Sequence, residues 1–180
     1  MKPTVFIIGT SSHAYQAGEG AVFGETTCSP EKATLFRNLL IGIIDQYRIR
    51  AIGEELSIDA LSEMKRTESI SKMVADSRTP PLPHRYCDPS RAEQEKLGIR
   101  DEGAIKIGLM NGRSPGEIDQ EIYAERRKRE PLWLNQMKAL SAWPTLFICG
   151  SWHVPSFSYL LREAGFHVTI VVDKWDVYPA

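Results

Sequence analysis

Short apolar runs rich in β-branched residues alternate with longer amphipathic segments along this chain. The runs predict strands that are buried on both faces, and the segments predict helices, because a helix repeats its apolar positions every three or four residues. The predicted strands are 4–8, 50–55, 84–88, 146–149 and 167–172. This alternation indicates a single α/β domain over residues 1–180, with a mainly parallel sheet and helices on both faces.

The amphipathic segments carry helix start signals. The predicted helices are 29–47, 57–75, 91–97, 114–140 and 154–164. Ser29 and Ser114 are each followed by proline, which is favoured at the first helical position, and Pro131 predicts a kink or a restart in the fourth helix. The segments 9–29 and 98–116 are rich in glycine and polar residues, so they predict long loops able to cover a site.

Two apolar strands end in the same pattern, a glycine followed shortly by a histidine. The first is Val5-Phe-Ile-Ile-Gly-Thr-Ser-Ser-His13, and the second is Leu146-Phe-Ile-Cys-Gly-Ser-Trp-His153. The carboxyl ends of parallel strands share one edge of the sheet, and ligands bind there in open α/β folds. We therefore expect His13 and His153 to converge on one site at this edge.

Acidic residues lie at the ends of two other predicted strands. Glu54 and Glu55 close the second strand, and Asp88 closes the third. Adjacent strand residues face opposite sides of a sheet, and we favour Glu55 as the one that joins the two histidines. Two imidazoles and a carboxylate are a usual ligand set for a divalent transition metal, so His13, Glu55 and His153 are candidate metal ligands.

Composition and charge narrow the class of protein. The 180 residues include 22 basic and 23 acidic side chains, and the net charge of -1 argues against a non-specific nucleic-acid binder or a membrane-surface protein. Cys28, Cys87 and Cys149 are too few and too scattered for a disulfide framework or a zinc ribbon. A reduced, cytoplasmic setting fits best, no run is long enough to span a bilayer, and a homo-oligomer is compatible with all of this.

Other polar groups carry weaker signals. The basic run that ends at Arg129 lies among glutamates, which favours a solvated helix face over a nucleic-acid patch. The Gly-Thr-Ser-Ser run could cradle a phosphate but has no Gly-Lys, so a nucleotide-binding domain stays a third interpretation. Cys87 could be a nucleophile, although no paired base is specified, whereas Cys149 lies in an apolar run. His84 and His167 have no strand-end context, and neither is given a role.

Four motifs follow one another along nearly the whole chain: Gly-Thr-Ser-Ser-His, Glu-Glu-Leu, Arg-Glu-x-x-Trp and Gly-Ser-Trp-His. Their order resembles the TraB/Tiki-like superfamily, which includes the erythromycin esterase and ChaN-like proteins. The resemblance implies an α/β core with His13, Glu55 and His153 as metal-binding or catalytic residues. It also implies that Arg129 orients a carboxylate or a substrate anion, a role that suits a planar guanidinium that stays charged.

Together with the residues at the strand ends, this resemblance implies a metal-dependent hydrolase that cleaves a peptide or ester bond in a peptide or small-molecule substrate. Manganese, cobalt or zinc is expected at the two histidines, with Arg129 steadying the developing negative charge. Three further residues are expected to support acid–base chemistry: Glu54, Tyr86 and Asp88. The alternative is a non-catalytic binding module for haem, another small ligand or a protein partner. The first motif favours it, because three residues separate Gly9 from His13 where the second motif has two.

Overall fold

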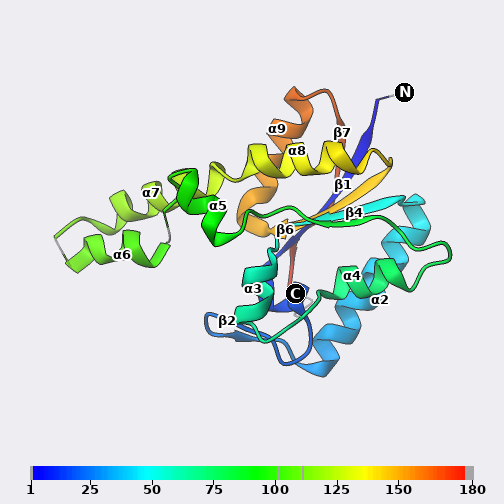
Figure 1. Ribbon diagram of the computed structural model, residues 1–180, viewed down its shortest axis with the longest axis horizontal. Coiled ribbons are helices and arrows are strands. Elements are labelled where there is room, and N and C mark those ends of the chain that lie inside the picture. The colour runs from blue at the N-terminus through cyan, green and yellow to red at the C-terminus, as the bar shows by residue number, and fades with distance from the viewer. Residues whose placement is uncertain (1, 101, 111, 177–180) are drawn as a thin grey trace.

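The computed structural model describes residues 2–100, 102–110 and 112–176, and Figure 1 shows a sheet with helices on either side of it. Within these residues the main sheet has five strands: β1 (Thr4–Thr10), β4 (Ala51–Glu54), β5 (His84–Tyr86), β6 (Thr145–Gly150) and β7 (His167–Trp175). They run parallel in the order β5-β4-β6-β1-β7. The predicted α/β fold with a mainly parallel sheet is confirmed.

Helices cover both faces of the sheet because successive strand residues point to opposite sides. Ile7 packs into one apolar core and Ile8 into the other. The covering helices are α2 (Pro30–Tyr47) and α4 (Ile70–Asp76) on the side of Ile8, and α8 (Glu130–Leu140) and α9 (Val154–Glu163) on the side of Ile7. A strand between two such cores must be apolar throughout, which accounts for the unbroken apolar runs of β1 and β6.

The central strand β6 brings the two Gly-His turns to one place. It lies between β4 and β1, and its register with β1 sets Gly150 opposite Thr10. Gly9, one residue earlier on β1, has no room for a side chain, because a Cβ there would lie 1.9 Å from the carbonyl oxygen of Asp173 on β7. Strands β6, β1 and β7 therefore pack tightly at their carboxyl ends. His13 follows β1 at this edge of the sheet, and His153 follows β6.

Three helices extend away from the sheet as an arm, on the left of Figure 1. They are α5 (Arg91–Lys96), α6 (Glu102–Met110) and α7 (Pro115–Arg127). The prediction of a loop over 98–116 is wrong for α6, whose glycines lower its helix propensity. Ile105 packs with Ile118 and Ile122 of α7, and this tertiary contact stabilises a helix that its own composition does not favour.

Two other predicted segments are divided in the structure. The helix expected over 57–75 is split into α3 (Ile58–Glu63) and α4, because Lys65 adopts a left-handed backbone conformation (φ 57°) and Ser69 caps a new helix. The loop expected over 9–29 contains a short helix and a hairpin: α1 (His13–Ala17), β2 (Val22–Phe23) and β3 (Thr26–Thr27). The predicted restart at Pro131 is confirmed, since α7 ends at Arg127 and α8 begins at Glu130.

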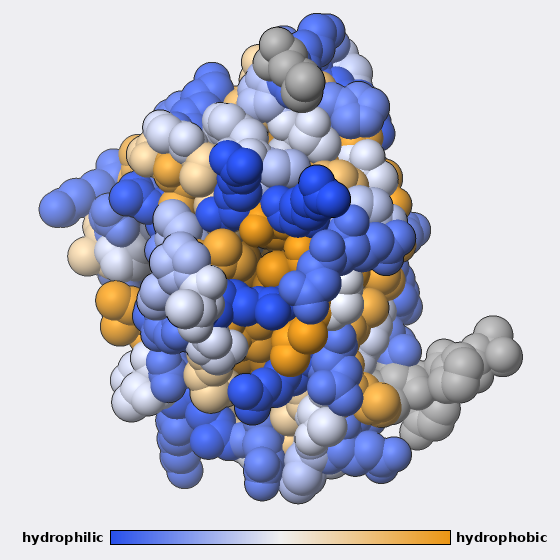
Figure 2. Space-filling model, turned by 90° about the vertical axis from the view of Figure 1, so that its right-hand side faces the viewer, coloured by the Kyte–Doolittle hydropathy of each residue, from blue (hydrophilic) through white to orange (hydrophobic). Residues whose placement is uncertain are grey.

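Figure 2 views the molecule from the side away from the arm. Hydrophobic residues form the floor of a hollow there, with strongly hydrophilic residues above it and to its right and residues of intermediate hydropathy to its left. Among the described residues, no helix combines the length and the apolar character needed to cross a membrane.

Candidate functional site

A pocket of about 380 Å³ lies between the carboxyl ends of the strands and the arm, since residues of both line it. It is lined by residues from β1, β6, the segment after β4, and the arm. Five of the residues singled out in the sequence line it: His13, Glu55, Asp88, Arg129 and His153. Residues separated by up to 140 positions in the chain therefore meet in one place.

Glu55 is the centre of the cluster. Its side chain is buried, and Oε2 accepts a hydrogen bond of 2.7 Å from the backbone N–H of Gly150. Oε1 accepts one of 2.9 Å from Arg129 Nη2 and lies 3.4 Å from Nε2 of both His13 and His153. Burial by itself would raise the pKa of Glu55, but the two histidines and Arg129 outweigh it and lower that pKa. Glu55 is therefore an ionised carboxylate held among cationic and donor groups.

Arg129 joins two acidic residues across the pocket. Its Nη1 donates to both oxygens of Asp88, at 3.0 and 2.9 Å, while Nη2 donates to Glu55. Asp88 also accepts a hydrogen bond of 2.9 Å from the indole nitrogen of Trp133. Burial raises the pKa of Asp88, against the lowering effect of Arg129. The rigid fork of donors on a guanidinium suits this bridging role, which a lysine could not fill in the same way.

His153 is held by a buried carboxylate behind it. Its Nδ1 lies 2.8 Å from Oε1 of Glu130, which also accepts a hydrogen bond from the hydroxyl of Ser156. Its Nε2 lies 3.2 Å from Nη2 of Arg129. A guanidinium can only donate, so a hydrogen bond between Arg129 and His153 requires Nε2 as the acceptor and places the imidazole proton on Nδ1, toward Glu130. Nε2 therefore lies at the pocket, close to both Arg129 and Glu55.

His13 is placed by the start of α1. Ser12 caps this short helix, accepting a hydrogen bond from the N–H of Ala14, and so holds the residue between them at the rim of the sheet. The ring of His13 lies edge-on to Phe23, with the ring centres 4.8 Å apart. Its Nε2 is buried and has no hydrogen-bond partner among the described residues. The extra residue of the first motif therefore still leaves His13 within reach of Glu55.

Sequence reasoning missed Glu130, whose side chain is 2% exposed in a helix that begins among charged residues. The pattern of the basic run and its glutamates predicts a solvated helix face that includes this residue. The available signal was its position directly after Arg129 in the Arg-Glu-x-x-Trp motif. A residue next to a candidate site residue at the first turn of a helix can turn toward the same site, and Glu130 does so.

Glu54 and Tyr86 are not brought to this pocket. Glu54 points to the other face of the sheet, where it accepts a hydrogen bond from the hydroxyl of Ser69 and lies 2.8 Å from Nε2 of His84. The hydroxyl of Tyr86 accepts a hydrogen bond from the N–H of Ser69. Ser71 completes this second cluster, with its hydroxyl 2.9 Å from the same His84 nitrogen. His84, for which the sequence predicts no role, is thus part of a buried polar network.

The cysteines have no part in the pocket. Cys87 is buried, and burial raises the pKa of its thiol to about 12. Burial also raises the pKa of Cys149 well above its usual value. Neither thiol therefore ionises near neutral pH, and the interpretation of Cys87 as a nucleophile loses its chemical basis.

The donor types at the pocket suit a divalent metal, but Arg129 opposes their use in the present arrangement. His13, Glu55 and His153 supply two imidazoles and a carboxylate, which bind transition metals at about 2.0–2.2 Å. Both imidazole nitrogens lie 3.4 Å from the same oxygen of Glu55, and the guanidinium of Arg129 is close to that oxygen and to His153. Among the described residues, no group of three or more His, Cys, Asp or Glu side chains is placed to hold a metal ion.

The sheet and the pocket define an α/β protein with a histidine–carboxylate–arginine cluster at the carboxyl ends of its strands. Comparison with protein-family models, curated proteins and solved structures finds no match to the chain. Its function is therefore argued from the chemistry of the cluster.

Proposed function

We propose that the protein is a hydrolase of ester or amide bonds in which His153 acts as the general base. The observation that carries this proposal is the pairing of His153 with Glu130 through Nδ1, which leaves Nε2 at the pocket beside Arg129. A base must have a free lone pair toward the substrate and an orienting partner on its other nitrogen. Glu130 is the orienting partner of His153, and Nε2 becomes free for the substrate when the donor of Arg129 turns from it to the substrate oxygen.

In the proposed reaction, Nε2 of His153 removes a proton from a water molecule as the water oxygen bonds to the substrate carbonyl carbon. The carbonyl oxygen takes up the negative charge, which the fixed positive charge of Arg129 stabilises. The bond from the carbonyl carbon to the leaving oxygen or nitrogen then breaks, and the proton on Nε2 passes to that leaving atom. One water is consumed, and an acid and an alcohol or amine are released.

Glu130 acts through His153 as a positioning residue. By accepting the hydrogen bond from Nδ1 it keeps the imidazole in the tautomer that presents a lone pair to the pocket. It also stabilises the positive charge that His153 carries after it has taken the proton. Ser156 donates to the same carboxylate oxygen and limits its movement.

A metal-dependent form of the same hydrolase is the second candidate, and the buried Nε2 of His13, which lies 3.4 Å from Glu55 at the pocket, favours it. His13, Glu55 and His153 would hold the ion, and manganese, cobalt or zinc would lower the pKa of bound water and polarise the carbonyl. Arg129 would turn away from His153 to admit it. Metal content measured by plasma mass spectrometry, on wild type and on the His13→Ala/His153→Ala double variant, tests this form: a stoichiometric ion lost in the folded variant supports it.

The test of the general base compares His153→Gln with wild type in hydrolysis of a panel of peptides and esters, before and after treatment with a chelator. We expect kcat/KM to fall at least about 100-fold in the variant, because general-base catalysis contributes about 100- to 10,000-fold. His167→Gln, an exposed histidine on β7 outside the pocket, is the matched control and keeps wild-type activity. Circular dichroism checks that each variant is folded.

Undiminished hydrolysis by His153→Gln would contradict the proposal. Absence of hydrolysis by wild type, combined with binding of a small ligand or haem in the pocket, would instead support the non-catalytic binding module.

A further inference from the structure

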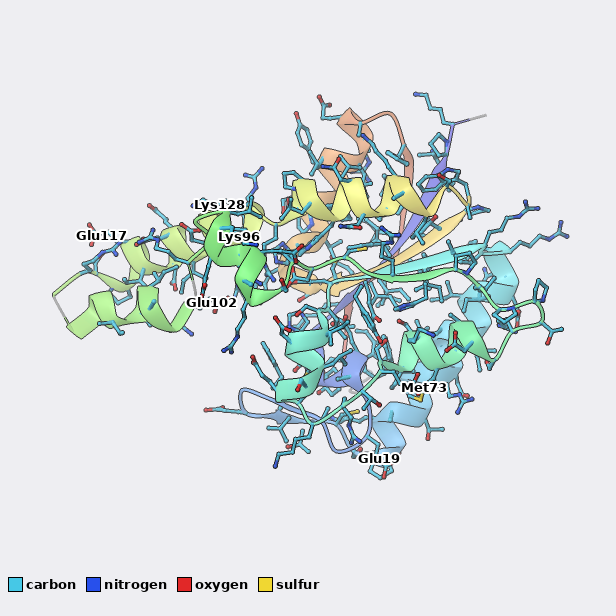
Figure 3. The ribbon with its side chains drawn as sticks, in the orientation of Figure 1. Glu19, Met73, Lys96, Glu102, Glu117 and Lys128 are labelled. Carbon is cyan, nitrogen blue, oxygen red and sulfur yellow. The ribbon has the colours of Figure 1, made fainter. Side chains whose placement is uncertain are left out.

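The charged side chains on the wall that the arm contributes to the pocket are already paired with one another. Arg126 donates a hydrogen bond of 2.6 Å to Glu102. Arg100 contacts Glu125 at 3.3 Å through its guanidinium and at 3.1 Å through its backbone N–H, and it also forms an ion pair with Glu121. In Figure 3, Glu102 lies near the base of the arm, whereas Glu117 lies farther out. This wall therefore offers little unpaired charge to a substrate.

Charge deeper in the pocket is also paired. The guanidinium of Arg129 contacts Asp88 and Glu55, so a substrate carboxylate would have to displace a buried ion pair. Breaking such a pair without replacing it is costly. The pocket as a whole is consequently better suited to an uncharged molecule than to an anion.

Two exposed aromatic side chains line the same pocket, one beside each histidine. Trp152 is 70% exposed and directly precedes His153, and the guanidinium carbon of Arg126 lies 5.9 Å from the centre of its ring. Phe23 is 47% exposed and packs edge-on against His13. Large apolar side chains that are exposed at the mouth of a concave site are typical of ligand binding.

We propose that the pocket selects an uncharged ester or amide with an aromatic ring next to the scissile carbonyl, and that Trp152 and Phe23 determine this specificity. Trp152 directly precedes His153, and both line the pocket. A substrate ring stacked on Trp152 would therefore place its attached carbonyl near the base, His153. Arg126 positions Trp152 through the contact with its ring. The volume of the pocket suits a compound of this size. This inference names the substrate class of the hydrolase proposed above and rests on that function.

The test uses three ethyl esters, which share one leaving group: ethyl phenylacetate, ethyl propionate and monoethyl succinate. We expect kcat/KM for the phenylacetate to exceed that for each of the other two by about tenfold or more, consistent with about 1.4 kcal/mol of ring stacking. Trp152→Ala removes most of this preference, mainly through KM, and Trp152→Phe restores part of it. Tyr159→Ala is the control, because Tyr159 is an exposed aromatic residue on α9 outside the pocket.

Benzyl methyl ketone has the shape of the phenylacetate but cannot be hydrolysed. Its binding therefore tests the aromatic specificity of the pocket independently of the hydrolase activity. Saturation-transfer NMR should detect binding to wild type and to Tyr159→Ala, with loss of signal in Trp152→Ala. Ketone binding that depends on Trp152, without hydrolysis of any ester, would support the pocket and overturn the hydrolase. Hydrolysis without aromatic preference, or no ketone binding at all, would overturn the inference.

Discussion

Glu54 and Glu55 are neighbours in the chain, and both are buried next to a histidine, yet they belong to two different kinds of cluster. Glu55 lines the pocket and shares its oxygens among Arg129, Gly150 and the two strand-end histidines. Glu54 does not line the pocket, and its Oε1 contacts a serine and His84 on the opposite face of the sheet. One step along the chain, from the last residue of β4 to the residue after it, is enough to separate a site open to ligands from a closed network.

The two clusters also differ in how they use an imidazole. Nε2 of His84 contacts both Glu54 and Ser71, so a single nitrogen serves the carboxylate and the hydroxyl. Nδ1 of His153 contacts Glu130, and Nε2 stays at the pocket. Passing a proton from substrate to base requires the orienting carboxylate and the substrate to use opposite nitrogens. Proximity of serine, histidine and glutamate therefore does not by itself indicate catalysis.

Replacing Arg129, the cation that Glu55 and Asp88 share, should have the largest effect on stability. Arg129→Met leaves two buried carboxylates, Glu55 and Asp88, without their counter-charge, and we expect the free energy of unfolding to fall by about 3–5 kcal/mol. Urea unfolding followed by circular dichroism measures this loss. Arg127→Met, an exposed arginine two positions earlier, is the control and should change stability by no more than about 0.5 kcal/mol. Equal effects of the two variants would contradict a central role for Arg129.

The Glu54→Gln variant tests the buried cluster that Glu54 forms with Ser69, Ser71 and His84. The amide weakens the contacts with Ser69 and His84, so we expect a loss of about 1–3 kcal/mol in the free energy of unfolding. Since Glu54 does not line the pocket, ester hydrolysis should stay within about threefold of wild type. Urea unfolding and the ester assay, run in parallel on one preparation, measure both quantities. A loss of activity as large as that of His153→Gln would contradict this expectation and indicate that Glu54 takes part in catalysis.

A smaller effect should appear in the pH dependence of the unfolding free energy, to which the carboxylate of Glu55 contributes. The pKa of Glu55 is raised by burial but is lowered more by the two histidines and Arg129, so it falls below the ordinary 4.5. The ionised form therefore contributes stability that is fully present above about pH 4.5 and is lost as the pH falls further. The difference in unfolding free energy between wild type and Glu55→Gln should shrink from about pH 5 to about pH 3. A constant difference over this range would show that Glu55 is not held as a carboxylate by its neighbours.

Much of the architecture could be predicted because a strand buried on both faces must be apolar throughout. The runs of β1 and β6 meet this condition, and the parallel arrangement then places the residues after Gly9 and Gly150 at one edge. The break between α3 and α4 could not be predicted, because it depends on the left-handed backbone of Lys65. Helix α6 was missed because contacts with α7, rather than its own composition, stabilise it.

Only those residues of the candidate site that follow a strand could be predicted from the sequence. His13, Glu55, Asp88 and His153 each follow a strand, so topology alone suggests that they meet. Glu130 was missed because its partner lies 23 positions later in the chain, and such a long-range contact leaves no local pattern.

The position of β6 at the centre of the sheet also orders events during synthesis. Within the described residues β1 pairs with β6 and β7, so this apolar strand gains its partners in the main sheet after residues beyond 145 have left the ribosome. Parallel pairing over such a separation is slow to form and leaves an exposed strand edge meanwhile. A nascent chain stalled before β6 would therefore be aggregation-prone and would depend on chaperones. His13 and His153 would therefore come together at Glu55 only after β6 has paired with β1.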